Sequence, residues 1–218
     1  EEHIERAIRS VINQRGLAMN EAITLYLVDD ASTDNTVSKA SSMLRGSNLK
    51  YDIIVNSENL GVARSAAKFF NDYLYRKDCF LVRLDADDFL MPDAISNLKK
   101  AYRDNHLVIG NYWEKTEKFS RVSPKSIYEA FACGVLMYIQ DIVEAGGLVN
   151  ADVCMFIEYD FYLRMFAIGV VPIMIDEVVY TYCRQPDSLT RDSTAVDKSL
   201  QALRDRWGDE VVSRIREY

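Results

Sequence analysis

Three aspartates close together form the most chemically suggestive cluster in this sequence: Asp85, Asp87 and Asp88. Carboxylates at this spacing repel one another unless something offsets their charge. Hard divalent cations such as Mg²⁺ and Mn²⁺ take carboxylate oxygens as ligands and commonly bridge phosphates. Alternate residues of an extended segment point the same way, so Asp85 and Asp87 can face one ligand together. The cluster therefore indicates a metal site or, equally, a solvated acidic turn in which Asp88 or Asp93 caps the next helix.

A second pair of carboxylates, Asp29 and Asp30, comes directly after a short apolar run. One of them can accept hydrogen bonds from a nucleobase or a ribose. The residues that follow, Ser32–Asp34, are typical of a helix N-terminus, so a capping cluster explains the pair as well. The two acidic clusters carry more weight together than singly, because both are expected at the same edge of a sheet.

The elements that would position these aspartates follow from the hydrophobic pattern, because helical spacing predicts helices and short apolar runs predict strands. In the first half we expect helices over 2–13, 32–44, 62–73 and 92–102, and strands over Ile23–Val28, Tyr51–Val55 and Cys79–Leu84. One face of the third helix is expected to carry Val62, Ala66, Phe69, Phe70 and Tyr73. This alternation predicts an α/β fold with a mostly parallel sheet covered by helices on both faces. Sites in such sheets lie outside the carboxyl ends of the strands, where both acidic clusters fall.

After residue 105 the pattern changes. We expect helices over Pro124–Ala132, Ile139–Ala145 and Asp160–Ile168, strands over Leu107–Trp113 and Val135–Tyr138, paired short strands at Val170–Ile175 and Val178–Tyr182, and a final helix over Thr194–Arg216. Gly146, Gly147 and Gly169 are expected to end two of the helices. The polar segments 114–126 and 184–194 are predicted to be loops that close over a ligand. No repeat or low-complexity linker divides the chain, which predicts a single domain.

Composition excludes several classes of protein. The chain has 218 residues, of which 49% are hydrophobic and 27% charged, an ordinary globular balance. Its net charge of −7 argues against a nucleic-acid binder, and no apolar run is long enough to span a membrane. The four cysteines are far apart and the chain has two histidines, so neither a zinc site nor a His-rich metal site is indicated. Reduced thiols and the absence of a leader pattern predict a cytoplasmic protein, at most associated with the cytoplasmic face of a membrane.

With these motifs in order, the sequence resembles the family 2 glycosyltransferases, inverting enzymes with the GT-A fold. The resemblance extends over roughly residues 4–190, and each motif is weak alone but their joint order is specific. The residues that carry it are Ser10-Val-Ile-Asn-Gln14, Leu27-Val-Asp-Asp-Ala-Ser-Thr-Asp-Asn-Thr36, Asn59-Leu-Gly-Val-Ala-Arg64, Arg83-Leu-Asp-Ala-Asp-Asp88, Met91-Pro-Asp93, Gly146-Gly147 and Glu158-Tyr-Asp-Phe-Tyr-Leu-Arg164.

The resemblance implies a nucleotide-sugar donor, a UDP-sugar by default, with Mn²⁺ or Mg²⁺ as cofactor. Asp87 would coordinate the metal through the diphosphate, together with Asp85, which would also face the ribose. The donor-binding set that it implies is Asp29, Asp30, Asn59, Arg64, Asp85, Asp88 and Arg184. The acceptor would be a hydroxyl of a glycan, a lipid-linked sugar or a protein.

The resemblance places the general base at Glu158, counting back from Arg164, where the family usually carries an aspartate preceded by a glutamate. Here the preceding residue is Ile157. A glutamate can deprotonate an acceptor hydroxyl as well as an aspartate can. The alternative base is Asp160, which is otherwise explained as a helix N-terminal acid stabilised by the helix dipole.

Two further departures from the family pattern affect the expected site. Gln185 stands where the family often has a histidine, so Arg184 is the residue expected to hold phosphate there. The family also begins with a strand before the first helix, and the printed sequence starts at the helix. We therefore expect a nucleotide-binding half over 1–105 that lacks the first strand, an acceptor-binding half over 106–190, and a C-terminal helix over 191–218.

Two other functions remain open. A sugar nucleotidyltransferase would share the sheet and the acidic site, but it should carry a Gly-rich, basic phosphate loop that these residues lack. A catalytically silent nucleotide-sugar-binding or scaffold domain is the second alternative, because a fold does not guarantee its function. The departures at Ile157 and Gln185 favour that alternative.

Overall fold

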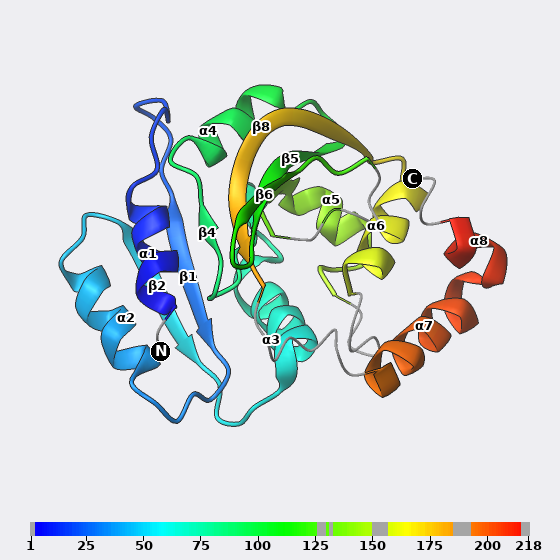
Figure 1. Cartoon of the computed structure of the whole chain (residues 1–218), viewed down its shortest axis with the longest axis horizontal. Coiled ribbons are helices and arrows are strands. Elements are labelled where there is room, and N and C mark those ends of the chain that lie inside the picture. The colour runs from blue at the N-terminus through cyan, green and yellow to red at the C-terminus, as the bar shows by residue number, and fades with distance from the viewer. Residues whose placement is uncertain (1–2, 126–129, 131–132, 150–156, 185–192, 215–218) are drawn as a thin grey trace.

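A computed structural model describes residues 3–125, 130, 133–149, 157–184 and 193–214 of the chain (Figure 1). Two sheets organise it. The smaller sheet pairs β1 (Thr24–Asp29) with β2 (Lys50–Val55) in parallel, and the larger has the strand order β3-β7-β5-β8-β4 with β6 added to β5. The strands of the larger sheet are β3 (Phe80–Val82), β4 (Phe89–Leu90), β5 (His106–Lys115), β6 (Phe119–Val122), β7 (Val135–Tyr138) and β8 (Val171–Cys183).

The helices lie on both faces of the sheets, as the pattern predicts. Figure 1 shows α2 beside the small sheet at one end of the molecule, and α7 and α8 at the other. The helices are α1 (Ile4–Ile12), α2 (Thr36–Arg45), α3 (Gly61–Phe69) continued by the π-helical turn η1 (Phe70–Leu74), α4 (Ala94–Ala101), α5 (Ile139–Glu144), α6 (Ile157–Ala167), α7 (Ser193–Trp207) and α8 (Asp209–Arg214). None of the described helices is long and apolar enough to cross a bilayer.

The small sheet is closed by the helices that flank it in sequence. Ile4 and Ile8 of α1 pack with Leu27 of β1 and with Ala40 and Leu44 of α2. These apolar positions recur at helical spacing, which is why the first two helices and strands match their predicted ranges closely.

The larger sheet is mainly antiparallel, so the expectation of a mostly parallel sheet is wrong there. Only β5 and β8 pair in parallel, whereas β3–β7, β5–β7, β5–β6 and β4–β8 are antiparallel. One cause is the segment 114–126, which was predicted to be a loop that closes over a ligand. It contains β6, which returns along β5 as a hairpin, and a hairpin makes its strands antiparallel.

β8 is one strand of 13 residues where two paired strands were expected. Asp176 and Glu177, which lie between the two expected strands, form an irregularity where the register against β5 shifts beside Gly110. The amide of Asn111 and the guanidinium of Arg121 both donate to the Asp176 carbonyl, at 2.7 and 2.6 Å. A β-carbon at Gly110 would lie 2.5 Å from Val179, so this close approach of β5 and β8 requires glycine.

The core lies on both sides of β5, because successive side chains of a strand face opposite ways. Leu107 and Ile109 pack with α5, α6 and η1 on one face, and Val108 and Tyr112 pack with α4 on the other. The face predicted for the third helix is right only in part: Phe70 is fully buried, but Val62 and Tyr73 are exposed. The other buried side chains of α3 and η1 are Ala63, Ser65 and Leu74.

The C-terminal helix is broken rather than continuous. Gly208 has a φ of +82° and separates α7 from α8. Leu203 of α7 is fully buried against Tyr159 and Leu163 of α6. The helix predicted over Pro124–Ala132 falls largely outside the described residues, whereas the helix ends at Gly146 and Gly169 are confirmed by their positive φ angles.

Candidate functional site

The acidic turn after β3 has a buried and an exposed side. Asp88 is 1% exposed, and its Oδ1 accepts a hydrogen bond of 2.8 Å from the backbone N–H of Cys183. The pKa of the Asp88 carboxyl is raised to about 7, chiefly by burial and also by the charges of Asp87 and Asp85. The hydrogen bond from Cys183 and the charge of Arg6 lower it in part. A proton or a cation therefore stabilises this carboxyl near neutral pH.

Arg83 fixes the orientation of Asp85. Its Nε and Nη2 donate to the two carboxylate oxygens of Asp85 at 3.0 and 3.2 Å, an arrangement in which the planar guanidinium matches the carboxylate. Burial raises the pKa of Asp87 as well, and the charge of Asp85 adds to that effect. The carbonyl of Asp87 accepts a 2.6 Å bond from Arg6 of α1, which ties the turn to the first helix.

A divalent cation fits this turn: Asp85 of the expected pair belongs to a group of residues that could hold an ion, and the role of Asp87 as a ligand stays a prediction. Ligand atoms of Asp85, Asp88 and Cys133 lie within 4.8 Å of one another. The raised pKa of Asp88 shows that its negative charge lacks full compensation, which a cation would supply. Cys133 was missed in the sequence because it is distant along the chain, and a β-bridge to Arg83 brings it here.

Asp30 holds the start of α3. Its Oδ1 accepts bonds from Asn56 Nδ2 at 3.0 Å, Leu60 N at 2.9 Å and Ser65 Oγ at 2.7 Å, and its Oδ2 accepts one from Gly61 N at 2.8 Å. Burial raises the pKa of Asp30, but these hydrogen bonds outweigh it and leave the pKa lowered. Asp30 thus holds the N-terminus of α3 rather than capping the helix that follows Ser32–Asp34, as the capping explanation expected, and its role with a nucleobase stays a prediction.

The other predicted donor-binding residues of the first half are placed differently. Asp29 is buried and its Oδ2 accepts the backbone N–H of Ser32 at 3.0 Å. Asn59 and Arg64 are exposed, with Arg64 in the first turn of α3. Asn56, whose buried amide also donates to Ser65 Oγ at 2.9 Å, was not among the predicted residues.

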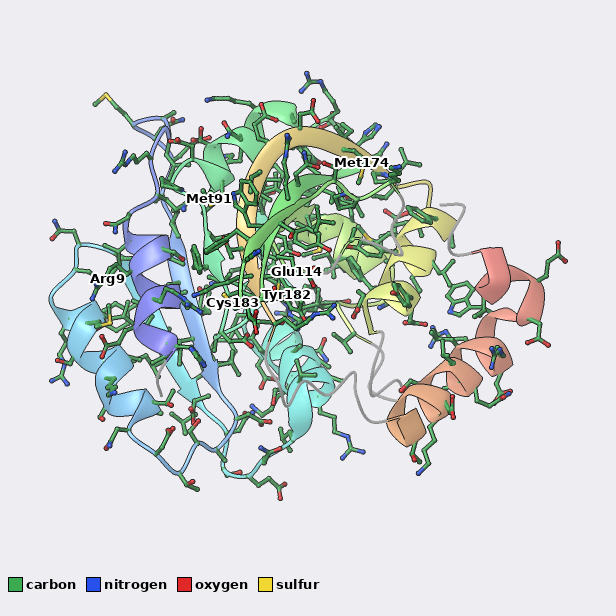
Figure 2. All side chains as sticks on the ribbon, in the orientation of Figure 1. Arg9, Met91, Glu114, Met174, Tyr182 and Cys183 are labelled. Atoms are coloured by element: carbon green, nitrogen blue, oxygen red, sulfur yellow. The ribbon has the colours of Figure 1, made fainter. Side chains whose placement is uncertain are left out.

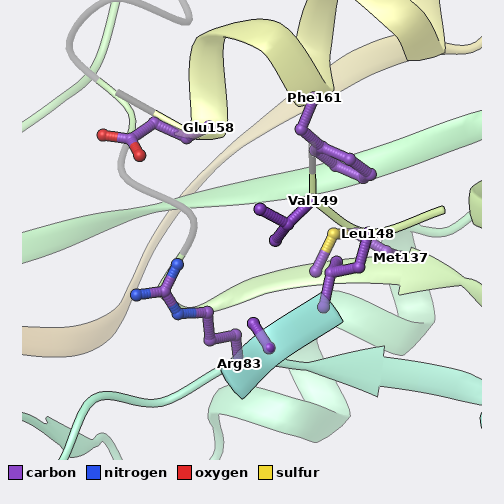
Figure 3. Close-up of a pocket in the computed structure, with 7 residues that line it drawn as sticks. Arg83, Met137, Leu148, Val149, Glu158 and Phe161 are labelled. Atoms are coloured by element: carbon purple, nitrogen blue, oxygen red, sulfur yellow. The ribbon is translucent and has the colours of Figure 1, made fainter. Parts of the chain in front are cut away.

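Glu158 lies in the first turn of α6, beside a hollow that Arg83 also lines (Figure 3). Burial raises the pKa of the Glu158 carboxyl, its own backbone N–H and the charge of Arg83 lower it, and Asp85 raises it. The net direction is upward, which makes Glu158 a better base than a free glutamate. The remaining described residues that line the hollow are Ala66, Met137, Leu148, Val149 and Phe161.

Asp160, the alternative base, is fully buried and is surrounded by donors from its own chain. It accepts bonds from Arg164 Nε at 2.8 Å and Trp207 Nε1 at 3.0 Å, and Arg206 Nε lies 3.2 Å from it. Arg164 also donates to the carbonyls of Ala145 and Gly147, at 2.8 and 2.5 Å. The network joins α6 to α7 and to the glycine turn, so this geometry favours Glu158 as the base.

Arg184 lies at the end of β8, next to the strand end of β5. Its Nε is 3.0 Å from Oε1 of Glu114, and its backbone N–H donates to the Lys115 carbonyl at 3.1 Å. Figure 2 shows Glu114, Tyr182 and Cys183 close together at this end of the two strands. Arg184 is exposed, its role with phosphate stays a prediction, and Gln185 lies outside the described residues.

Comparisons with known proteins point to one family. The family model described as glycosyl transferase family 2 matches residues 1–157. No curated protein matches the chain.

Solved glycosyltransferases share the fold. TarS of S. aureus, in complex with UDP-GlcNAc, aligns over 99% of this chain and 67% of its own, with a TM-score of 0.71 and 12% identity. The mannosyltransferase PcManGT of Pyrobaculum calidifontis, with GDP-Man and Mn²⁺, aligns over 94% and 61%, with a TM-score of 0.66 and 17% identity. GalNAc-T7, with UDP, GalNAc and Mn²⁺, aligns over 95% and 46%, with a TM-score of 0.66 and 12% identity. The chain thus has the GT-A fold and spans from about half to two thirds of these structures.

Proposed function

Because the chain belongs to glycosyl transferase family 2, we propose that it moves a sugar from a UDP-sugar to a hydroxyl of a glycan or another acceptor, with inversion at the anomeric carbon. One observation carries the proposal. Arg83 pairs with Asp85 of the acidic turn and lines the same hollow as Glu158. A single arginine thereby links the expected donor-binding carboxylates to the expected base.

The chemistry follows from these positions. Glu158 accepts the proton of the acceptor hydroxyl while the hydroxyl oxygen forms a bond to the anomeric carbon. The bond from that carbon to the β-phosphate oxygen breaks at the same time, and its electron pair leaves with the nucleoside diphosphate. Attack opposite the leaving group inverts the anomeric centre, and holding both substrates in line supplies much of the rate.

The acidic turn would hold Mn²⁺ or Mg²⁺ through the neighbouring carboxylates of Asp85 and Asp88, with Asp87 as the further expected ligand. The Cys133 thiol beside them is a poor ligand for such hard cations. When bound, such an ion supplies Lewis-acid stabilisation of the departing diphosphate. The buried carboxyl of Asp88, with its pKa of about 7, is the group that most needs this partner. The solved relatives that contain Mn²⁺ support the assignment by likeness of fold.

Titration calorimetry tests the donor site directly. We expect UDP to bind more tightly than GDP or dTDP, in the presence of Mn²⁺, and Asp87→Ala to abolish the metal-dependent part of the binding. Asp72→Ala is the matched control, because Asp72 is exposed on η1 and pairs with Lys68 at 2.9 Å, a surface contact. Failure of all three nucleotides to bind would favour the catalytically silent alternative. A cytoplasmic location stays a prediction.

A further inference from the structure

The hollow beside Glu158 is apolar over most of its lining. Five of its seven described lining residues are apolar, namely Ala66, Met137, Leu148, Val149 and Phe161. They come from α3, β7, the segment after the glycine turn, and α6. Figure 3 shows Leu148, Met137 and Phe161 at one side of the hollow, with Val149 between them and the charged residues.

The two charged residues lie together at the other side. Figure 3 shows the Arg83 guanidinium and the Glu158 carboxylate facing the same space, with the aliphatic stem of Arg83 continuing toward the apolar side. Nε and Nη2 of Arg83 are taken by Asp85. Among the described residues nothing accepts a hydrogen bond from Nη1, which leaves a charged donor at the mouth of an apolar hollow.

We propose that this hollow receives the acyl group of a 2-acylamino sugar, an N-acetyl group in the simplest case, carried by the nucleotide donor. The proposal rests on the proposed function and names its substrate class. The acyl carbonyl accepts a hydrogen bond from Arg83, and the acyl methyl packs against Leu148, Val149 and Phe161.

Other sugar substituents suit the hollow less well. A bare hydroxyl would reach Arg83 but would leave the apolar wall without a contact, and an unfilled apolar hollow loses its dispersion contacts. A carboxylate, as in a uronic acid, would be attracted by Arg83 but repelled by Asp85 and Glu158, which both lie near that guanidinium. An amide with a small alkyl tail satisfies both sides of the hollow.

The donor, rather than the acceptor, is assigned because of the elements that form the hollow. Ala66 belongs to α3, the helix that carries the predicted donor residue Arg64. Arg83 follows β3 and leads into the acidic turn at Asp85. The other five lining residues belong to the half assigned to the acceptor, so the hollow lies between the two halves. It falls to the donor because Arg83 bonds Asp85 of the turn proposed to hold the diphosphate, and the donor sugar must lie between that diphosphate and the proposed base Glu158.

The test compares two donors that differ only at carbon 2, UDP-GlcNAc and UDP-Glc, with UDP as the reference for the nucleotide site. Calorimetry on the whole chain with Mn²⁺ should give UDP-GlcNAc an affinity about fourfold above that of UDP-Glc, the effect of one buried methyl, because the 2-hydroxyl of UDP-Glc also reaches Arg83. Ala66→Leu should fill the hollow and bring the ratio to about one, with the affinity for UDP unchanged. Ala67→Leu is the matched control, because Ala67 is also partly exposed on α3 and does not line the hollow.

Each outcome bears on the proposal. If UDP binds but the two sugar nucleotides bind equally, the acyl pocket is refuted and the proposed function stands. If Ala66→Leu weakens the binding of UDP and of both sugar nucleotides by the same factor, the hollow has only a structural role and the proposal fails. If UDP itself does not bind, the proposed function fails and this inference with it. Val149→Thr, an isosteric change that places a hydroxyl in the apolar wall, should lower the ratio about threefold and replaces Ala66→Leu if that variant does not fold.

Discussion

At the scale of one residue, the buried carboxyl of Asp88, a proposed metal ligand, should make the stability of the folded protein depend on pH. Its pKa is about 7 in the folded protein against an ordinary value of 3.8, so the folded state binds this proton more tightly than the unfolded state does. The stabilising contribution is complete below about pH 4 and is lost as the pH rises through about 7. The free energy of unfolding of the metal-free protein should therefore fall over this range, by roughly 2–4 kcal/mol.

Asp88→Asn should remove that pH dependence. The asparagine oxygen can still accept the N–H of Cys183, and the amide carries no charge to bury. Urea unfolding at pH 5 and pH 8 measures the difference, with Asp52→Asn on β2 as an exposed control. An equal pH dependence in wild type and Asp88→Asn would show that another group titrates.

Glu158→Gln should lower kcat by roughly 10²–10⁴ with little change in KM for the donor, because the amide cannot take a proton. In the wild type, burial raises the pKa of Glu158, so kcat should rise with pH through a value above 4.5. Steady-state transfer assays over pH 4.5–9 check both, with exposed Glu144→Gln as the control. Full activity of Glu158→Gln would remove Glu158 from the role of base.

At the scale of elements, α7 is attached to α6 through a buried carboxylate. Trp207 donates its indole N–H to Asp160, which Arg164 links in turn to the carbonyls of Ala145 and Gly147. Breaking one bond to a buried charge leaves that charge less compensated. Because Glu158 lies on the same helix, the position of the base depends on this attachment.

Trp207→Phe keeps an aromatic ring but loses the N–H donor. We expect it to lower the free energy of unfolding by roughly 1–3 kcal/mol, as expected for a hydrogen bond to a buried charged group. Trp113→Phe on β5 is the matched control, because among the described contacts its indole N–H makes no hydrogen bond. Urea unfolding of both variants measures this difference. An equal decrease in the free energy of unfolding for the two would contradict a specific role for the indole N–H of Trp207.

At the scale of the whole molecule, the first half was easier to predict than the second. Local signals sufficed for α1, β1, α2 and β2, where apolar spacing and turn residues agree. Long-range pairing determined the rest. Asp176 and Glu177 lie between two expected strands, but pairing of the flanking residues with β5 holds them inside one strand. Gly208 ends a helix that the apolar spacing would continue.

The candidate site shows the same division. The acidic turn and Glu158 were found because their motifs are contiguous in the sequence. Cys133 was not predicted, because only a β-bridge brings it to Asp85. Asn56 was not predicted, because only a hydrogen-bond network brings it to Asp30. The absence of one strand from the expected family order stays a prediction.

The separation of the strands into two sheets also determines which parts of the molecule unfold locally. Within the part of the chain that the structure describes, β1 pairs only with β2, and β3 pairs only with β7. The packing of Leu25 and Tyr26 and the hydrogen bonds that Asp30 accepts from α3 therefore connect the β1–β2–α2 unit to the rest, without a continuous backbone ladder across the described part of the molecule. Units held in this way exchange their amide hydrogens through partial opening, at a lower free energy than complete unfolding.

Hydrogen–deuterium exchange read by mass spectrometry should show amides of β1, β2 and α2 exchanging together, at least tenfold faster than those of β5 and β8, since 1.4 kcal/mol of lower opening free energy gives a factor of ten. A ligand that also contacts Asp29 or Arg64 should slow this group as a whole. Equal protection of β1 and β5 would mean that the two sheets open as one. If the two sheets instead open separately, as we expect, a nucleotide that contacts both would couple their opening, and its binding would be measured as a gain in the cooperativity of the fold.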